Sequence, residues 1–226
     1  MEKSRDLSRV LAPLLFAALA ACSDLPQRAD PASDAPEGQR PRTAEFKDAA
    51  SYPQALQAWR TPEDVNAWIG AKFQYDMSRA MMLSESQRSR SGPVHIHEAE
   101  EFFSAPSGIC VDLSRFAVET LQRIAPELKA HYLMIEFSPV SIGGNTLRMH
   151  WLAAFTRGGQ HYFFADSKRP GHLAGPYAST AEYIAEYSAY RNRQVVAFRE
   201  LESYKRKQRT MAAKQKREQR SPEPAR

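Results

Sequence analysis

The sequence predicts a single α+β domain in which one helix packs on an antiparallel sheet. Three observations predict it: an amphipathic stretch at 110–124, strand-like segments at 131–137, 146–155 and 160–165, and a glycine pair between the last two. A helix followed by consecutive strands with a short glycine turn is typical of antiparallel α+β architecture. With 226 residues, of which 42% are hydrophobic, the chain can bury one ordinary core but hardly two.

The first predicted helix begins at Pro62. Thr61 precedes it as N-cap, and Glu63 and Asp64 fall in its first turn, where acids favour the helix dipole. Apolar residues then keep helical spacing: Val65, Trp68, Ile69 and Phe73. Residues 78–97 carry no steady periodicity, so we expect an exposed loop there.

The helix predicted at 110–124 has the clearest apolar stripe in the chain, and Pro126 should end it. Its members are Leu113, Phe116, Ala117, Thr120, Leu121 and Ile124. The three strands follow, and a helix near 180–190 and a short strand at 195–198 complete the body.

The N-terminus resembles the signal peptide of bacterial lipoproteins. A basic start, a short apolar run over 11–21 and small residues lead directly to Cys22. The resemblance implies that residues 1–21 are removed and that Cys22 is acylated, which would make the lipid the membrane anchor. Ser23 favours the outer membrane facing the periplasm; the alternative is the periplasmic side of the inner membrane. An ordinary secretory signal with a chance cysteine is the other interpretation of the segment.

Charge and composition divide the remaining chain into a tether at 22–50, a domain at 51–204 and a basic tail at 205–226. The tether carries four prolines and few large apolar residues. The tail holds nine basic and two acidic residues, whereas residues 22–204 carry a net charge of −3. The tail predicts either binding to an anionic surface or a solvated segment with no specific partner. Export and the acidic body argue against nucleic acid as a partner.

Cys110 is the one cysteine left if Cys22 is acylated, so no disulfide is expected. It stands where a loop turns into the helix predicted at 110–124. A helix N-terminus favours a thiolate over a thiol, as a nucleophile requires. The alternative is a small buried apolar residue, because unpaired cysteines are among the most buried residue types. The position alone does not separate these two interpretations.

Two further residues later in the chain, His150 and Asp166, extend the nucleophile hypothesis. His150 lies within the predicted strand "MHWLAAF", and Asp166 follows the next strand in "YFFADSK". Together with "SGICVDLSRFAVETL" and "TPEDVNAWIGAKFQYD", this order resembles the transglutaminase-like superfamily of papain-like thiol enzymes. The resemblance covers about residues 50–200. It implies a papain-like fold and a thiol-dependent peptidase or amidase that acts on a protein or peptide.

Carried onto this sequence, the resemblance makes Cys110 the nucleophile, His150 the general base and Asp166 the residue that orients His150. Gln74 and Tyr75 are candidates for a side-chain donor to the oxyanion. The alternative function is a catalytically silent domain of the same fold that binds a protein or a cell-wall partner.

The triad requires a particular loop length in the hairpin between the second and third predicted strands. Opposed residues of an antiparallel pair share a face. For His150 to oppose Asp166, the loop must be the three residues 157–159. A two-residue turn at 158–159 instead places Asp166 opposite Trp151, on the wrong face. We therefore predict the longer loop, or a bulge of the same effect. We also predict a hydrogen bond between Asp166 and one ring nitrogen of His150, with the other ring nitrogen facing Cys110.

No metal or cofactor is predicted. His95 and His97 form a short "HIH" motif, but no third ligand follows at metal-site spacing, so a surface pair is expected. Asp112 is expected to complement the dipole of its helix. The alternative is a calcium ligand, as similar acids are in some transglutaminase-like relatives.

Overall fold

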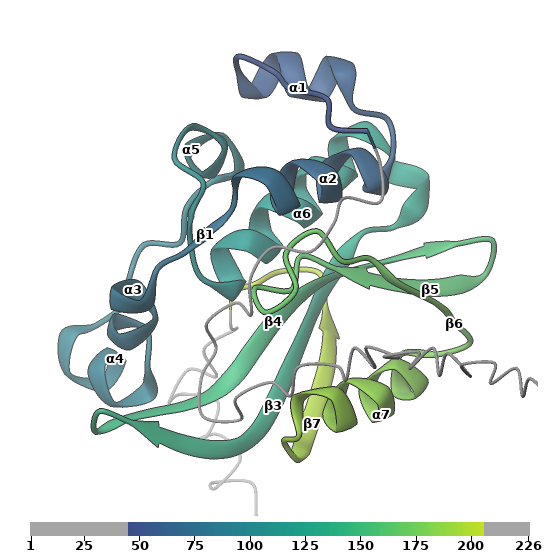
Figure 1. The fold of residues 1–226 in the computed structure, drawn as a ribbon. Helices are drawn as coiled ribbons and strands as arrows, with labels where there is room; N and C mark the ends of the chain where they lie inside the picture. The colour runs from purple at the N-terminus through teal and green to yellow at the C-terminus, as the bar shows by residue number, and fades with distance from the viewer. Residues whose placement is uncertain (1–44, 206–226) are drawn as a thin grey trace, which may run out of the picture.

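A five-stranded antiparallel sheet forms the centre of the computed structural model, which describes residues 45–205 (Figure 1). The strand order is β6-β5-β4-β3-β7. The strands are β3 (His131–Ile142), β4 (Asn145–Arg157), β5 (Gln160–Phe164), β6 (Ala174–Tyr177) and β7 (Val195–Leu201). Helices cover both faces of this sheet, which confirms the predicted α+β class.

Helix α6 (Cys110–Ile124) covers one face, which we call the α6 face. Its apolar stripe packs against Ala153 and Phe155 of β4 and Tyr132 of β3. The outer side of α6 is covered by α1 (Tyr52–Ala58), α2 (Pro62–Lys72) and α5 (Ala99–Ser104). The predictions for α2 and α6 are confirmed, and Thr61 caps α2 in a capping box with Asp64.

Helix α7 (Thr180–Arg191) covers the opposite face, which we call the α7 face. Tyr183, Ile184 and Tyr187 of α7 pack against side chains of the three central strands. These side chains are Leu133, Ile135, Phe137, Leu152, Ala154 and Phe163. Since both faces of β4 are buried, its two sets of alternating side chains enter two different cores.

The segment expected to be a loop at 78–97 contains two short helices, α3 (Met77–Met82) and α4 (Glu85–Ser91). The side chains of Asp76 and Ser84 accept hydrogen bonds from the first turns, 2.9 Å and 3.3 Å long. The loop prediction was therefore wrong, because helices of six and seven residues are too short to develop an apolar period. Both helices lie beside the β3–β4 hairpin (Figure 1).

A small parallel pair precedes α6. Strand β1 (Gln74–Tyr75) pairs with β2 (Ser107–Gly108), and a short 3-10 helix, η1 (Pro126–Leu128), follows α6. The pairing sets the end of α2 beside the start of α6, although the two are more than thirty residues apart in sequence.

The β4–β5 hairpin has the shorter of the two turns considered. Arg157 opposes Gln160, so the turn contains only Gly158 and Gly159, at φ +60° and +75°. Two consecutive residues at positive φ match the twist of the flanking strands, and glycine adopts this conformation without strain. The predicted three-residue loop was therefore wrong.

The predicted tether at 22–50 makes contacts with the body at its C-terminal end. The Trp59 indole N–H donates to the Lys47 carbonyl at 3.2 Å, and Lys47 Nζ lies 2.7 Å from Asp64 Oδ1. The proposed signal peptide, Cys22, the rest of the tether and the tail from residue 206 lie outside the described residues. No helix within 45–205 is long and apolar enough to cross a bilayer.

Candidate functional site

His150 and Asp166 lie in direct contact. His150 Nε2 is 3.0 Å from Asp166 Oδ1, so the predicted hydrogen bond is confirmed. The two-residue turn alone would have carried Asp166 to the other face of the sheet. Ala165 prevents this: its φ of +59° ends β5 and turns the chain. This left-handed residue has the effect that the longer loop or a bulge was expected to provide.

Asp166 is the centre of a buried polar network. It accepts hydrogen bonds from the Tyr187 hydroxyl at 3.1 Å, the Lys168 backbone N–H at 2.9 Å and Arg169 Nε at 3.4 Å. Arg191 Nη1 donates to the Tyr187 hydroxyl at 2.6 Å. Burial alone would raise the pKa of Asp166, but the hydrogen bond from His150 and the nearby cations hold that pKa well below its usual range. Asp166 is therefore ionised in the folded protein.

The His150 ring belongs to the α7 face. His150 opposes Ile135 of β3, which lies in the core beneath α7. The ring is completely buried and stacks on Tyr187 with centroids 6.1 Å apart. Side chains alternate along a strand, so the neighbours Met149 and Trp151 point to the α6 face.

Cys110 lies on that other face. It is the first residue of α6 and lines a cleft of about 250 Å³, which we call the Cys110 cleft. The floor of the cleft is formed by strand residues of β3 and β4: Met134, Thr146, Leu147, Arg148, Met149 and Trp151. The walls come from Tyr75, from residues of α3, α4 and the loop after them, from the start of α6 and from Tyr204 and Lys205. His150 does not line the cleft.

The predicted triad is therefore not assembled, and this part of the prediction was wrong. His150 and Asp166 meet under α7, whereas Cys110 faces α3, α4 and the α6 side of β4. Among the described residues that line the cleft there is no histidine. The second ring nitrogen of His150, Nδ1, was expected to face Cys110; it is buried without a hydrogen-bond partner within the described part of the chain.

The two oxyanion candidates are separated as well. Tyr75 lines the Cys110 cleft, while Gln74 is exposed and does not line it. The β1–β2 pairing positions Tyr75, because Gln74 N–H donates to Pro106 O at 2.8 Å and Asp76 N–H donates to Gly108 O at 2.9 Å.

Asp112 fastens one wall of the cleft to α6. Its carboxylate is fully buried and accepts from the Ile109 N–H at 3.1 Å, the His97 N–H at 2.9 Å and Arg79 Nε and Nη2, each at 2.8 Å. A Cβ on Gly108 would lie 2.9 Å from Asp112 Oδ2, so the close approach requires glycine. These four donors occupy the carboxylate, which argues against the calcium alternative.

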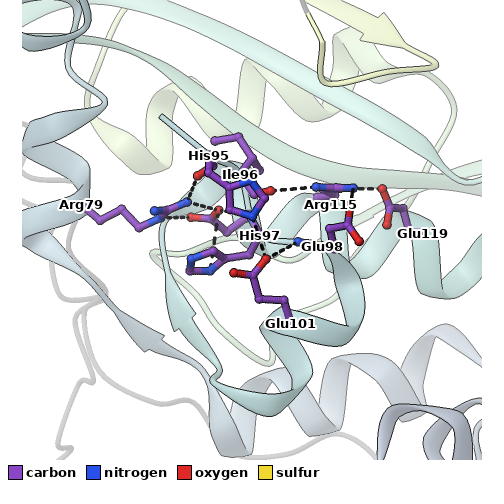
Figure 2. A network of polar contacts seen from close by, with 9 residues as sticks. Arg79, His95, Ile96, His97, Glu98, Glu101, Arg115 and Glu119 are labelled. Carbon is purple, nitrogen blue, oxygen red and sulfur yellow. Dashed lines mark hydrogen bonds and ion pairs between the residues drawn. The ribbon is translucent and has the colours of Figure 1, made fainter. Parts of the chain in front are cut away.

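Arg115 holds the same loop from the other side (Figure 2). It donates to the Ile96 carbonyl at 2.8 Å and lies 3.5 Å from Glu98 and 2.7 Å from Glu119. His95 pairs with Glu101 at 2.8 Å. Within residues 45–205, no group of three or more potential metal ligands comes together. The polar contacts between α6 and the loop at 92–98 thus form a clamp that holds the loop against the helix.

The comparisons with known proteins returned no relative: no family model matches the chain, and no curated protein matches it.

Sequence reasoning missed the residues that form the floor of the cleft. One signal was available. Alternate residues of a strand share a face, so Leu152 and Ala154 lie on the same face as His150, and Met149 and Trp151 lie on the opposite face. Both sets are apolar, however, so the pattern does not indicate which set faces α6.

Proposed function

We propose that this chain is an exported, non-catalytic binding module of transglutaminase-like type. The order of elements supports the type: a helix that begins at the cysteine is followed by antiparallel strands that carry the histidine and lead to the aspartate. The separation of Cys110 from His150 supports the absence of catalysis. A cysteine nucleophile requires a base within hydrogen-bond reach, and here the sheet lies between the two residues.

The observation that carries the proposal is the burial of the histidine–aspartate pair. Both side chains lie under α7, and their network consists of residues that join α7 and the loop at 167–169 to the sheet. The pair therefore stabilises the fold, and the Cys110 cleft is left as a binding surface for a protein or cell-wall partner.

Thiol labelling tests the non-catalytic assignment. We expect iodoacetamide to alkylate Cys110 at the same rate in the folded wild type and in folded His150→Gln. Tyr187→Phe is the matched control, since it disturbs the same network without changing the imidazole. A labelling rate that falls in His150→Gln but not in Tyr187→Phe would show that the imidazole activates the thiol, and the proposal would fail.

Anchoring is part of the proposal. Acylated Cys22 would hold the domain at the outer membrane, facing the periplasm, and the tail at 205–226 would add electrostatic attraction to an anionic surface. We expect Cys22→Ser to leave the protein unprocessed or soluble. Membrane fractionation checks this and separates the outer from the inner membrane; detergent-free release of mature wild type would contradict it.

A further inference from the structure

We propose that the Cys110 cleft takes an apolar anchor side chain of a protein partner, and that this side chain is flanked by acidic residues of the partner. The inference rests on the non-catalytic function proposed above and names the chemistry of its partner.

The first argument is the lining of the cleft. Three of the five methionines of residues 45–205 line the cleft or pack on its wall, and the other two lie on α3, whose Ala80 lines it. Met134 and Met149 form part of its floor, and Met81 packs on the cluster of Ala80, Ile109 and Val111 that forms one wall. Met77 and Met82 are exposed on α3, by 41% and 49%. Methionine is flexible and polarisable, and surfaces rich in it adapt to varied apolar side chains.

The second argument is size. The cleft measures about 250 Å³, which is below the range of about 300–1,000 Å³ typical of sites that enclose a whole small-molecule ligand. It is sufficient for one or two large side chains, as in interfaces where an anchor fills a pocket. Met77 lies one helical turn before Ala80, which lines the cleft, so apolar surface continues beyond the cleft itself. A protein partner would cover this exposed surface, whereas a small ligand would leave it in water.

The third argument is charge. Arg148, which lines the cleft, is paired with Glu85 at 2.8 Å and with Glu136 at 3.7 Å. Arg88 and Lys205 also line the cleft, and among the described residues neither forms an ion pair with a carboxylate. An apolar cleft with uncompensated cations at its rim is complementary to an apolar side chain between acidic ones.

The fourth argument is that one wall is fixed in advance. The Arg79–Asp112 ion pair and the Arg115–Ile96 hydrogen bond hold α3 and the loop at 92–98 against α6. A preformed wall reduces the entropy lost on binding. The residues that adapt would then be the methionines rather than the backbone.

Labelled peptides test the proposal on the mature chain with Cys22→Ser, used without detergent because detergent would fill an apolar cleft. The probe is a fluorescein-labelled ten-residue peptide with a central Leu-Phe pair between glutamates. Two matched peptides replace either the Leu-Phe pair by serines or the glutamates by lysines. We expect the probe to bind at least tenfold more tightly than either matched peptide.

Variants locate the binding. Met149→Lys should lower the affinity for the probe at least tenfold, and Arg88→Glu should lower it several-fold. Arg123→Glu, at the far end of α6 from Cys110, makes the same charge change and should have little effect. Equal binding of the three peptides, no binding below 1 mM, or equal effects of Arg88→Glu and Arg123→Glu would overturn the proposal. Displacement of the probe by vesicles of phosphatidylcholine and phosphatidylglycerol would also overturn it, in favour of a lipid surface.

The same assay separates this inference from the function on which it rests. A covalent adduct or cleavage of the probe by wild type, absent in Cys110→Ser, would refute the non-catalytic function while binding in the cleft remained. A probe that does not bind while Cys110 stays inert would refute this inference alone.

Discussion

Asp166, which the sequence suggests as a catalytic residue, lies in the structure at the centre of a buried polar network. Its buried carboxylate forms hydrogen bonds with a ring nitrogen of His150, the Tyr187 hydroxyl, the Arg169 guanidinium and the Lys168 backbone N–H. These partners come from β4, from α7 and from the turn that follows β5. A charge with this many donors joins three parts of the fold, and its loss leaves buried cations without their counter-ion.

The first prediction concerns this carboxylate. Asp166→Asn should lower the free energy of unfolding by about 3 kcal/mol at neutral pH, since it breaks a buried pair and leaves Arg169 without its anionic partner. Urea denaturation measures the change. Glu127→Gln, on the exposed 3-10 helix, is the control and should change stability by less than about 0.5 kcal/mol. Similar losses in the two variants would contradict the structural role.

The second prediction is the pH dependence of that stability. The pKa of Asp166 is lower in the folded than in the unfolded chain, so the unfolded chain binds a proton first as the pH falls. The contribution of Asp166 is fully present above about pH 4, the ordinary pKa of the group, and is lost as the pH falls toward the folded value. Stability should therefore drop more steeply below pH 4 in wild type than in Asp166→Asn. Parallel pH profiles would refute the shifted pKa.

Among the elements, α3, α4 and the loop at 92–98 depend most on side-chain contacts. They carry few residues of the main core. Asp112 and Arg115 attach α3 and the loop to α6, and the Glu85–Arg148 ion pair attaches α4 to β4. Segments with little buried apolar surface open locally at lower free energy than the core. The stability of this wall is therefore set by the clamp.

The third prediction tests the clamp. Arg79→Met keeps most of the side-chain volume but removes the ion pair with Asp112. We expect amide hydrogen exchange over 92–98 to accelerate at least about tenfold, while exchange in β3 and β4 changes little. Arg88→Met, in the same region but without a carboxylate partner among the described residues, is the matched control. Unchanged exchange over 92–98 would show that apolar packing alone holds the wall.

The elements that sequence analysis predicted correctly carry strong local signals. The capping residues before α2 and the apolar stripe of α6 specify helices without reference to the rest of the chain. The short helices α3 and α4 carry no such signal. The side of the sheet that His150 faces was also beyond local reasoning, because residues 152–155 of β4 are apolar and buried on both faces of the sheet.

The hairpin shows a related limit. Glycines at 158 and 159 fit either turn length, and the contact between His150 and Asp166 was predicted for the wrong reason. The contact is made by a positive φ at Ala165, a residue whose type rarely adopts it. Tertiary contacts, not local preference, determine that conformation, and the sequence alone does not reveal it.

At the scale of the whole molecule, the folded domain extends to the edge of the basic tail. Tyr204 stacks on the Arg115 guanidinium, 4.9 Å from its ring centroid, and meets Tyr132 edge-on at 6.0 Å. Its contacts join the end of the domain to α6 and to β3.

The fourth prediction follows from these contacts. A chain that ends at residue 205 should keep its melting temperature within about 2 °C, whereas one that ends at residue 202 should lose about 1 kcal/mol or more through the lost Tyr204 contacts. Differential scanning calorimetry measures both. A large drop on removal of 206–226 alone would show that the tail docks on the domain.

The alternation along β4 has an evolutionary consequence. Both neighbours of His150 in β4, Met149 and Trp151, line the cleft that contains the Cys110 thiol. A histidine moved by one position along the strand would therefore lie beside the thiol. No shift of register or change of fold is required: Met149→His or Trp151→His would put an imidazole on the same side as Cys110. We expect one of these variants to raise the iodoacetamide rate of Cys110 at least about tenfold near neutral pH. If the non-catalytic function proposed above holds, one substitution would turn the cleft into a reactive site and leave the histidine–aspartate pair in place under α7.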